Sequence, residues 1–340
     1  MPEIPEKRNN NLDDQLNLSA FIKEKALSLG FSRVGILSGE VMTETLEEAS
    51  HGFESWLDQG HHGDMAWMEG HLSLRKDPNT VLEGVQSIVC VLLNYFPGRH
   101  QETDSYKVAK YARGKDYHLL IREKLRILLK EIQKVAPEVQ GRPVTDSAPL
   151  HEKPLAVRSG LGWVGKNGNL ISPQHGSWFF LGELLLNVPL ESDFGSTNPQ
   201  NRALKDKTNL CGTCTRCIDA CPTEAILTNG NNIGVIDATR CISYWTIEAK
   251  ASEFPVHIQK NLSGWAYGCD ICQDVCPWNL KFETMTTEMG FLNPQTPASL
   301  DPDKILEMSQ DTFQNQFKET PIKRLGLSGL QRNVRALMPE

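Results

Sequence analysis

The sequence predicts an α+β protein made of a mixed helix and strand domain, a cysteine-rich module and a short helical end. Residues 1–190 alternate between helical and strand-like hydrophobic periods. Eight of the nine cysteines then lie between Cys211 and Cys276, and two short helices are expected beyond a stretch rich in Pro, Thr and Ser. A chain of 340 residues is long enough for these parts. The expected boundaries are a domain over 1–190, a polar linker over 191–209, a module over 210–285 and helices over 286–340.

The first half of the mixed domain alternates helix and strand. Residues 18–30 have helical spacing and end on a glycine, which commonly closes helices. The run FSRVGIL that follows predicts a strand. Residues from about 40 to 80 are expected to be mostly helical, with turns at Gly60–Gly63 and before Pro78. The β-branched apolar run over 87–95 predicts a second, buried strand.

The second half begins with a strongly amphipathic helix over 118–135. An extended piece, PVTDSAP, and a helix over 153–159 come next. The runs GNLISP and SWFFLGELLLN predict two strands of a hairpin that is joined through Gln174–Gly176. Together these elements make an α/β domain.

Composition and charge exclude several classes of protein. A hydrophobic content of 39% and a charged content of 23% are ordinary for a globular protein, and no apolar run is long enough to span a membrane. The polar N-terminus resembles no export signal, so we expect a cytoplasmic protein. The net charge of −7 argues against indiscriminate binding of nucleic acid. Basic residues nevertheless gather in two segments, 99–134 and 318–335.

The cysteines follow the spacing of bacterial ferredoxins. A CxxCxxCxxxCP run begins at Cys211, and a stretched second run consists of Cys241 and a CxxCxxxCP run that begins at Cys269. In this arrangement the last cysteine of each run crosses to the other cluster. The rule gives two [4Fe–4S] sites, the first held by Cys211, Cys214, Cys217 and Cys276 and the second by Cys221, Cys241, Cys269 and Cys272.

A pair of structural zinc sites is the alternative, because four thiolates also suit zinc. Zinc motifs usually pair two short CxxC knuckles, whereas successive three-residue spacings that end in Cys-Pro favour cubanes. A two-cluster module transfers single electrons and has no substrate pocket of its own, so the chemistry is expected in the first domain. The ninth cysteine, Cys90, lies in an apolar strand and is expected to be an inert core thiol.

Two near-motifs lie in the first domain. Residues 160–165 match GxGxxG, but the segment before them resembles a helix end and the segment after them a strand, which disfavours a dinucleotide site. Asp116 and His118 resemble the Asp-x-His-x-x-Gly motif of some cobalamin enzymes, although Ile121 replaces the glycine. His118 is therefore not assigned as a cobalt ligand, and a surface position at the start of a helix is the plainer interpretation.

The segment from Val144 to Pro154 is more informative. Asp146 lies beside Ser and Pro at the end of an apolar stretch, where its carboxyl group can point into a cleft. The alternative is a helix cap for the residues that follow, a common role for Asp and Ser.

Family-specific strings extend over most of the chain, from about residue 18 to residue 335. They are VTDSAPLHEKPLAVRSGLGWVGKNGNL, SWFFLGELLL, CGTCTRCIDACPTEAI, RCISYWTIE, YGCDICQDVCPWN and TPIKRLGLSGLQRN. On these strings the chain resembles the epoxyqueuosine reductases. The resemblance implies a cobalamin-dependent oxidoreductase with two [4Fe–4S] clusters, a nitroreductase-like corrinoid domain and a HEAT-like helical piece at the C-terminus.

The resemblance also implies the reaction and its residues. Epoxyqueuosine becomes queuosine at the wobble position of tRNAs with GUN anticodons, through cob(I)alamin that the clusters generate one electron at a time. Asp146 matches the family's general acid, and its pKa is expected to be raised by a partly apolar pocket. Candidate corrinoid contacts are Arg75, Tyr111, Tyr117, Lys166, Asn169, Ser243 and Tyr244.

The expected partners are tRNA and an electron donor. Phosphates of the anticodon stem-loop are expected to meet Lys110, Arg113, Lys115, Lys318, Lys323, Arg324, Arg332 and Arg335, although such side chains are commonly just a solvated face. The donor is an unidentified low-potential protein, and we expect a monomer with no membrane contact. Two alternatives stay open: a reductive-dehalogenase-like reductase of a small molecule, and an electron-transfer subunit without catalysis.

Overall fold

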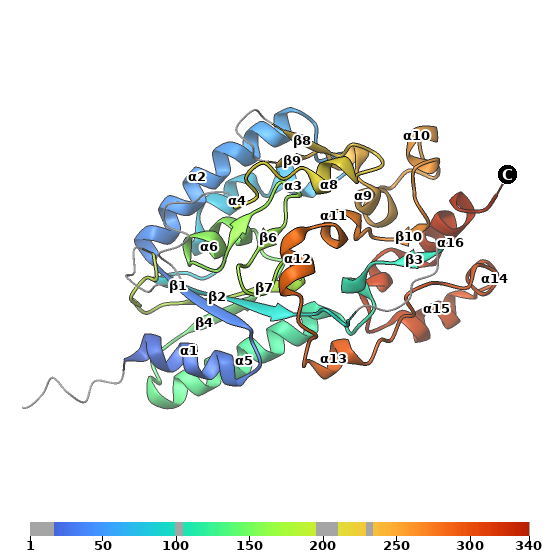
Figure 1. The fold of residues 1–340 in the computed structure, drawn as a ribbon. Helices are drawn as coiled ribbons and strands as arrows, with labels where there is room; N and C mark the ends of the chain where they lie inside the picture. Colours follow the sequence, from blue (N-terminus) through green and yellow to red (C-terminus); the bar gives the residue numbers. More distant parts are fainter. Residues whose placement is uncertain (1–16, 99–104, 195–209, 229–233, 340) are drawn as a thin grey trace, which may run out of the picture.

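A four-stranded antiparallel sheet organises the first domain (Figure 1). The structure, a computed structural model, describes residues 17–98, 105–194, 210–228 and 234–339. The sheet has the order β1-β2-β7-β4, with the bounds Arg33–Ser38, Ser87–Asn94, Phe179–Leu186 and Gly141–Val144. The expected strands over 87–95 and at FSRVGIL are therefore confirmed. Among the described helices, none is both long and apolar enough to cross a bilayer.

Helices cover both faces of this sheet, which explains why β2 is apolar from Ile88 to Leu93 (Figure 1). Its odd-numbered residues, such as Val91, pack with one helix pair, and its even-numbered residues, such as Leu92, pack with the other. The first pair is α1 (Leu18–Ser28) and α5 (Tyr117–Val135), and the second is α2 (Gly39–Asp58) and α6 (Glu152–Arg158). All four helices match expected helical segments.

The predicted hairpin is wrong. β7 lies inside the sheet, and both of its edges are already paired, to β2 and to β4. The GNLISP run instead gives β6 (Leu170–Ile171), which pairs with β5 (Trp163–Val164). A single bridge between Ser172 and Gly176 is what remains of the expected pairing. The GxGxxG match begins just after α6 and contains β5, so it lies in a helix-to-strand connection.

Short elements fill the rest of the described chain. In the first domain they are α3 (Trp67–Gly70), α4 (Leu72–Lys76), η1 (Pro78–Thr80), β3 (Lys107–Val108) and η2 (Lys110–Ala112). The cysteine-rich part contains α8 (Arg216–Asp219), β8 (Ile226–Thr228), β9 (Gly234–Ile236), η3 (Ala238–Arg240), α9 (Ile242–Ile247), α10 (Val256–Gln259), β10 (Trp265–Tyr267), α11 (Ile271–Asp274) and α12 (Pro277–Phe282). The C-terminal part contains α13 (Met289–Leu292), α14 (Pro302–Leu306), α15 (Gln310–Phe317), η4 (Pro321–Arg324) and α16 (Gly326–Ala336).

The three parts share buried contacts. β10 of the cysteine-rich part pairs with β3 of the first domain, and Tyr267 on β10 packs in one core with Val108, Phe317 and Leu330. The C-terminal helices therefore close over the strand pair that joins the first two parts. The expected domain boundaries stay predictions, and most of the expected linker, from 195 to 209, lies outside the described residues.

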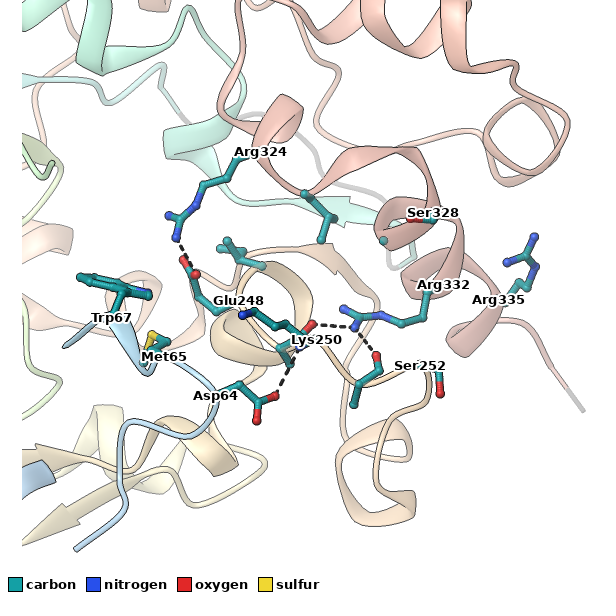
Figure 2. Close-up of a pocket in the computed structure, with 15 residues that line it drawn as sticks. Asp64, Met65, Trp67, Glu248, Lys250, Ser252, Arg324, Ser328, Arg332 and Arg335 are labelled. Carbon is teal, nitrogen blue, oxygen red and sulfur yellow. Dashed lines mark hydrogen bonds and ion pairs between the residues drawn. The ribbon is translucent and has the colours of Figure 1, made fainter. Parts of the chain in front are cut away.

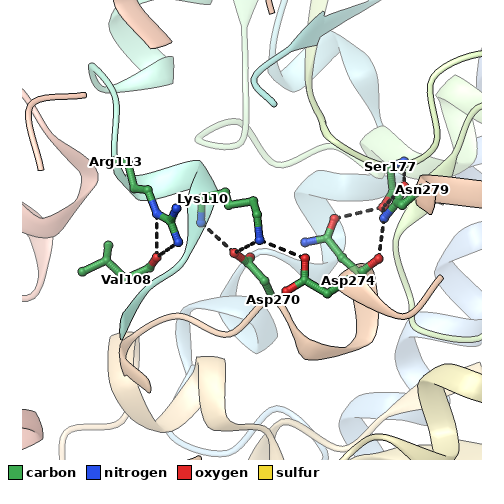
Figure 3. Close-up of polar contacts among 8 residues, drawn as sticks. Val108, Lys110, Arg113, Ser177, Asp270, Asp274 and Asn279 are labelled. Carbon is green, nitrogen blue, oxygen red and sulfur yellow. Dashed lines mark hydrogen bonds and ion pairs between the residues drawn. The ribbon is translucent and has the colours of Figure 1, made fainter. Parts of the chain in front are cut away.

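Asn279 on α12 fastens the cysteine-rich part to the segment before β7 (Figure 3). Its side-chain oxygen accepts a hydrogen bond of 2.6 Å from the backbone N–H of Ser177. Its side-chain nitrogen donates to the backbone oxygen of Gln273 at 2.8 Å. Asn279 is only 1% exposed, so both partners depend on this side chain and not on water.

Asn279→Ala is expected to lower the free energy of unfolding by about 1–3 kcal/mol, because a buried N–H loses its acceptor. Urea unfolding of the anaerobically prepared holoprotein, followed by tryptophan fluorescence, measures this change. Asn315→Ala, on an exposed position of α15, is the matched control and should unfold as the wild type does. Equal stability of the two variants would contradict the role given to Asn279.

Candidate active site and cluster-binding cysteines

Four cysteines surround a cavity of about 210 Å³ between the two halves of the cysteine-rich part. They come from the turn that precedes α8, from α8 itself and from the residue that caps α12: Cys211, Cys214, Cys217 and Cys276. The Lys166 ammonium group donates to the backbone oxygens of Gly212 at 2.8 Å and Cys214 at 3.1 Å, which holds the turn in place. These are the four residues expected to hold the first cluster.

The other four cysteines form a second group. Cys241 caps α9 and lies in the electrostatic field of Cys221, while Cys269 and Cys272 neighbour each other and Cys241. Burial, followed by the neighbouring thiols, raises the pKa of Cys269 and Cys272 well above the ordinary value. Such thiols ionise only beside compensating positive charge, which a bound iron–sulfur cluster provides.

The spacing of these thiols bears on the zinc alternative. Among the described residues, no three His, Cys, Asp or Glu side chains lie close enough to hold a single metal ion. A zinc ion needs sulfur atoms about 2.3 Å from the metal, whereas a cubane spreads its four ligands around a larger body. The 210 Å³ cavity between the first four cysteines fits the larger group.

A second cavity, of about 270 Å³, lies beside the sheet of the first domain. Asp146 stands at its mouth, just beyond the end of β4, and its side chain is 52% exposed. The Asp146 backbone has φ of +55°, a conformation that costs a non-glycine residue energy and is concentrated at functional sites. The cavity is lined by Tyr117, Thr145, Asp146, Glu152, Lys153, Asn169, Leu170, Ser177, Phe179, Phe180 and Leu181.

Three residues at the start of α5 form the surroundings of the Asp146 carboxylate. Tyr117 and His118 contact it directly, and Asp116 contacts His118. The Tyr117 hydroxyl donates to Asp146, and His118 Nε2 lies 3.4 Å from the same oxygen. The other ring nitrogen of His118 lies 2.8 Å from Asp116. Burial opposes the charged form of His118, yet the two carboxylates outweigh it and raise the His118 pKa to about 9.

This arrangement corrects the expectation for Asp146. Partial burial favours the neutral acid, but the hydrogen bonds from His118 and Tyr117 outweigh it and lower the pKa of Asp146. At neutral pH the proton therefore lies on His118, and Asp146 is its ionised partner. The sequence analysis placed His118 on the surface at the start of a helix, so it missed the contact of His118 with Asp146.

Two further carboxyl groups approach the cavity and were not predicted. Glu152, at the first turn of α6, accepts a hydrogen bond from the backbone N–H of Asp146. Glu183, in the middle of β7, is fully buried. Burial and nearby carboxylates raise the pKa of Glu152 to about 7 and that of Glu183 well above its ordinary value. A glutamate inside the apolar run SWFFLGELLL is the sequence signal that could have identified Glu183.

The predicted corrinoid contacts separate into groups. Tyr117 and Asn169 line the Asp146 cavity, and Tyr111 packs edge-on against Phe180 of its wall. Lys166 is a correction, because its ammonium group is buried against the Cys211–Cys214 turn and is unavailable to a corrinoid.

The remaining candidates are not among the residues that line that cavity. The Arg75 guanidinium is buried and donates to the Leu150 backbone oxygen at 2.6 Å. The Tyr244 hydroxyl accepts from the backbone N–H of Asp64 at 2.7 Å, and Ser243 is half-buried beside it on α9. The contacts of Arg75, Ser243 and Tyr244 with a corrinoid stay predictions.

Two of the predicted phosphate contacts are wrong. Lys110 is buried and bonds to Asp274 at 2.8 Å and Asp270 at 3.5 Å, and the buried Arg113 donates to the Val108 backbone oxygen (Figure 3). Lys110 neutralises two carboxylates and Arg113 binds a backbone oxygen, so neither presents its charge to solvent.

Three of the predicted C-terminal cations, Arg324, Arg332 and Arg335, line a larger cavity of about 630 Å³ (Figure 2). Arg324 pairs with Glu248 at 2.6 Å, and Arg332 donates to three backbone oxygens, those of Trp245, Ala249 and Ala251. Arg335 lines the same cavity and points away from these pairs. The exposed members of the predicted set are Lys318, Lys323, Arg324 and Arg335, whereas Lys115 is half-buried.

Comparison with known proteins finds one match over the cysteine-rich part and another over a segment that includes Asp146. A model of the 4Fe-4S double cluster binding domain matches residues 210–279, and a model described as Epoxyqueuosine reductase QueG, DUF1730 matches residues 75–147. An epoxyqueuosine reductase of Leadbetterella byssophila is 42% identical over 313 residues, which cover 92% of this chain and 96% of the relative.

Solved structures extend the likeness to the fold. An epoxyqueuosine reductase crystallised with a tRNA-Tyr epoxyqueuosine-modified tRNA stem loop has a TM-score of 0.73 and 27% identity, covering 94% of this chain and 80% of its own. A Bacillus subtilis epoxyqueuosine reductase, whose aspartate catalytic loop is swung out of the active site, has a TM-score of 0.77 and 26% identity with the same coverage. By its sequence over nine-tenths of its length, this chain belongs to the epoxyqueuosine reductase family.

Proposed function

We propose that this chain is an oxidoreductase that reduces epoxyqueuosine to queuosine at the wobble position of tRNAs with GUN anticodons. The observation that carries the proposal is the Asp146 cluster at the mouth of the 270 Å³ cavity, in a chain of the epoxyqueuosine reductase family. The related structure with a modified stem loop supports tRNA as the substrate carrier.

Aromatic and polar side chains at this cavity would contact a bound corrinoid. The rings of Tyr117 and Phe180 stack face to face, 4.1 Å apart at an angle of 5°, and Asn169 lines the same cavity. These three residues would hold the ring of cobalamin. When bound, the two clusters would supply single electrons and the corrinoid the strong nucleophile or one-electron donor that opens an epoxide.

The chain's own contribution is the proton. His118 holds it at neutral pH, and Asp146 lies between His118 and the cavity. A proton passed from His118 Nε2 through the Asp146 carboxylate reaches the oxygen that leaves the carbon atom, as general acid catalysis requires. The strained φ of Asp146 and the swung-out aspartate loop of the Bacillus subtilis relative support a loop that positions this carboxylate.

The remaining assignments complete this proposal. Residues 1–190 form the corrinoid domain with a nitroreductase-like fold, 210–285 the ferredoxin-like module and 286–340 a HEAT-like helical piece. The protein works as a monomer with an unidentified low-potential donor. Cysteines that would hold iron–sulfur clusters and form no disulfide suit the reducing cytoplasm.

The cluster assignment predicts crossed damage. Cys276→Ser should impair the first cluster and Cys221→Ser the second, although each residue lies in the other sequence run. Anaerobically prepared wild-type protein should contain about eight iron and eight sulfide per chain, and each variant about half, measured chemically and by electron paramagnetic resonance. Cys90→Ser is the control and should keep both clusters. Loss of the neighbouring cluster in either variant would refute the crossing.

The acid assignment predicts that Asp146→Asn keeps the clusters and cobalamin but slows epoxide reduction by about a hundredfold or more. Wild-type turnover should fall as pH rises through about 9, because His118 then loses the proton that it supplies. In the variant the His118 pKa, measured by NMR, should drop because a carboxylate partner is lost. Asp311→Asn, at an exposed position, should behave as the wild type does. Unchanged turnover in Asp146→Asn would move the acid elsewhere.

The tRNA assignment predicts that Lys323→Glu combined with Arg335→Glu weakens binding of a cognate anticodon stem-loop and flattens its salt dependence, because fewer counterions are released. Both side chains are exposed, whereas Arg332 is occupied inside the protein. Affinity is measured by fluorescence anisotropy at several salt concentrations. Lys304→Glu, whose side chain is 80% exposed on α14, is the control for charge alone. An equal loss of affinity in the double variant and in the Lys304→Glu control would exclude a localised phosphate site.

A further inference from the structure

The most unusual buried group outside the acid pair is Glu183. It lies in the centre of β7, directly opposite Cys90 of β2, on the sheet face that α2 and α6 cover. Its side chain is fully buried, and within the described part of the chain no N–H or alcohol group donates a hydrogen bond to either of its carboxyl oxygens. An isolated carboxylate in such a place is very costly, so Glu183 must carry a proton.

The group that Glu183 meets is another carboxyl, that of Glu152. Two ionised carboxylates are acceptors only, so they can hydrogen-bond to each other only when one proton lies between them. Glu152 in turn lines the Asp146 cavity and accepts from the Asp146 backbone N–H. The carboxyl pair therefore extends from the interior of the sheet to the wall of the cavity where the acid stands.

The proposed reaction needs more protons than the acid pair holds. Both C–O bonds of the epoxide break, a C=C bond forms between the two carbons, and the oxygen leaves as water. Two electrons from the clusters and two protons balance this change. His118 and Asp146 share one ionisable proton between them at neutral pH, so one turnover requires a second proton from another group.

We propose that Glu152 and Glu183 share the second proton and deliver it, through the Glu152 carboxyl, into the Asp146 cavity during each turnover. This inference rests on the proposed reduction of epoxyqueuosine. Glu183 acts through Glu152 and is a positioning residue that keeps the proton out of water. After turnover the pair regains its proton from solvent through the open mouth of the cavity.

The charged and titratable groups that face this pair set the pH at which the Glu152 carboxyl loses its proton. Nearby carboxylates favour the protonated form and the Arg75 cation disfavours it; the facing groups are Arg75, Cys90, Tyr117, Asp146 and Lys153. Burial comes first among the causes, and together they raise the Glu152 pKa to about 7. Turnover should therefore fall in two steps as pH rises, near 7 when Glu152 loses its proton and near 9 when His118 does.

The test compares holoenzyme in single turnovers on an epoxyqueuosine-modified stem-loop, across a pH range that includes both steps. In Glu152→Gln the step near pH 7 should vanish, and the rate below it should fall by about a hundredfold. The step near pH 9 should remain. Glu183→Gln should weaken the step near 7 while keeping shape and packing, and the exposed Glu191→Gln should change nothing.

Infrared spectroscopy gives a readout without turnover. The wild type should show the carbonyl band of a buried protonated carboxyl at neutral pH, and Glu183→Gln should lack it. A missing band in the wild type would overturn the shared proton, and an unchanged pH profile in Glu152→Gln would overturn the relay alone. If the wild type shows the band but does not reduce the modified stem-loop, the proposed function fails and this role in it fails with it, while the shared proton stands.

Discussion

The buried ion pair between Lys110 and Asp270 is the interaction on which the relative placement of cavity and clusters depends. Asp270 lies directly beside the cluster ligand Cys269, and it is 1% exposed. It accepts from the Lys110 backbone N–H at 2.8 Å as well as facing the ammonium group, which also bonds to Asp274. Neither charge can be buried alone without a large penalty. The second cluster site is therefore held against the first domain by a contact that tolerates little movement.

The proposed active site combines an ionised carboxylate at the cavity with a protonated carboxyl group in the sheet behind it. Asp146 is kept ionised by donors that point at it, whereas burial and the neighbouring Glu152 carboxyl raise the pKa of Glu183 and keep it neutral. Glu152 lies between the two and has a pKa of about 7. Environments that push the pKa values of neighbouring acids apart are the usual way in which a fold assigns a proton donor and an anion at the same pH. The stacked rings of Tyr117 and Phe180 line the same cavity as Asp146 and Glu152.

Several of the basic side chains bind groups inside the protein and do not face solvent. The chain carries 35 Lys and Arg residues, and some of those in the two basic segments belong to this group. Lys110 and Arg113 are buried, and Arg332 ties α16 to three backbone oxygens of the cysteine-rich part. The surface left for RNA phosphates is consequently smaller than the sequence count suggests. A small set of exposed cations is consistent with recognition that also requires the substrate nucleoside to enter a cavity.

The sequence by itself determined what depends on neighbours along the chain. Cysteine spacing placed four ligands around one cavity, hydrophobic periods located β2 and α5, and the strings around Asp146 identified the family. Tertiary structure decided which groups are buried and what they meet. Lys110 and Asp270 are 160 residues apart, and the pairing of β7 with β2 excluded the local hairpin. Side-chain pKa values followed the same rule, because burial and charge partners come from segments that meet only in the fold.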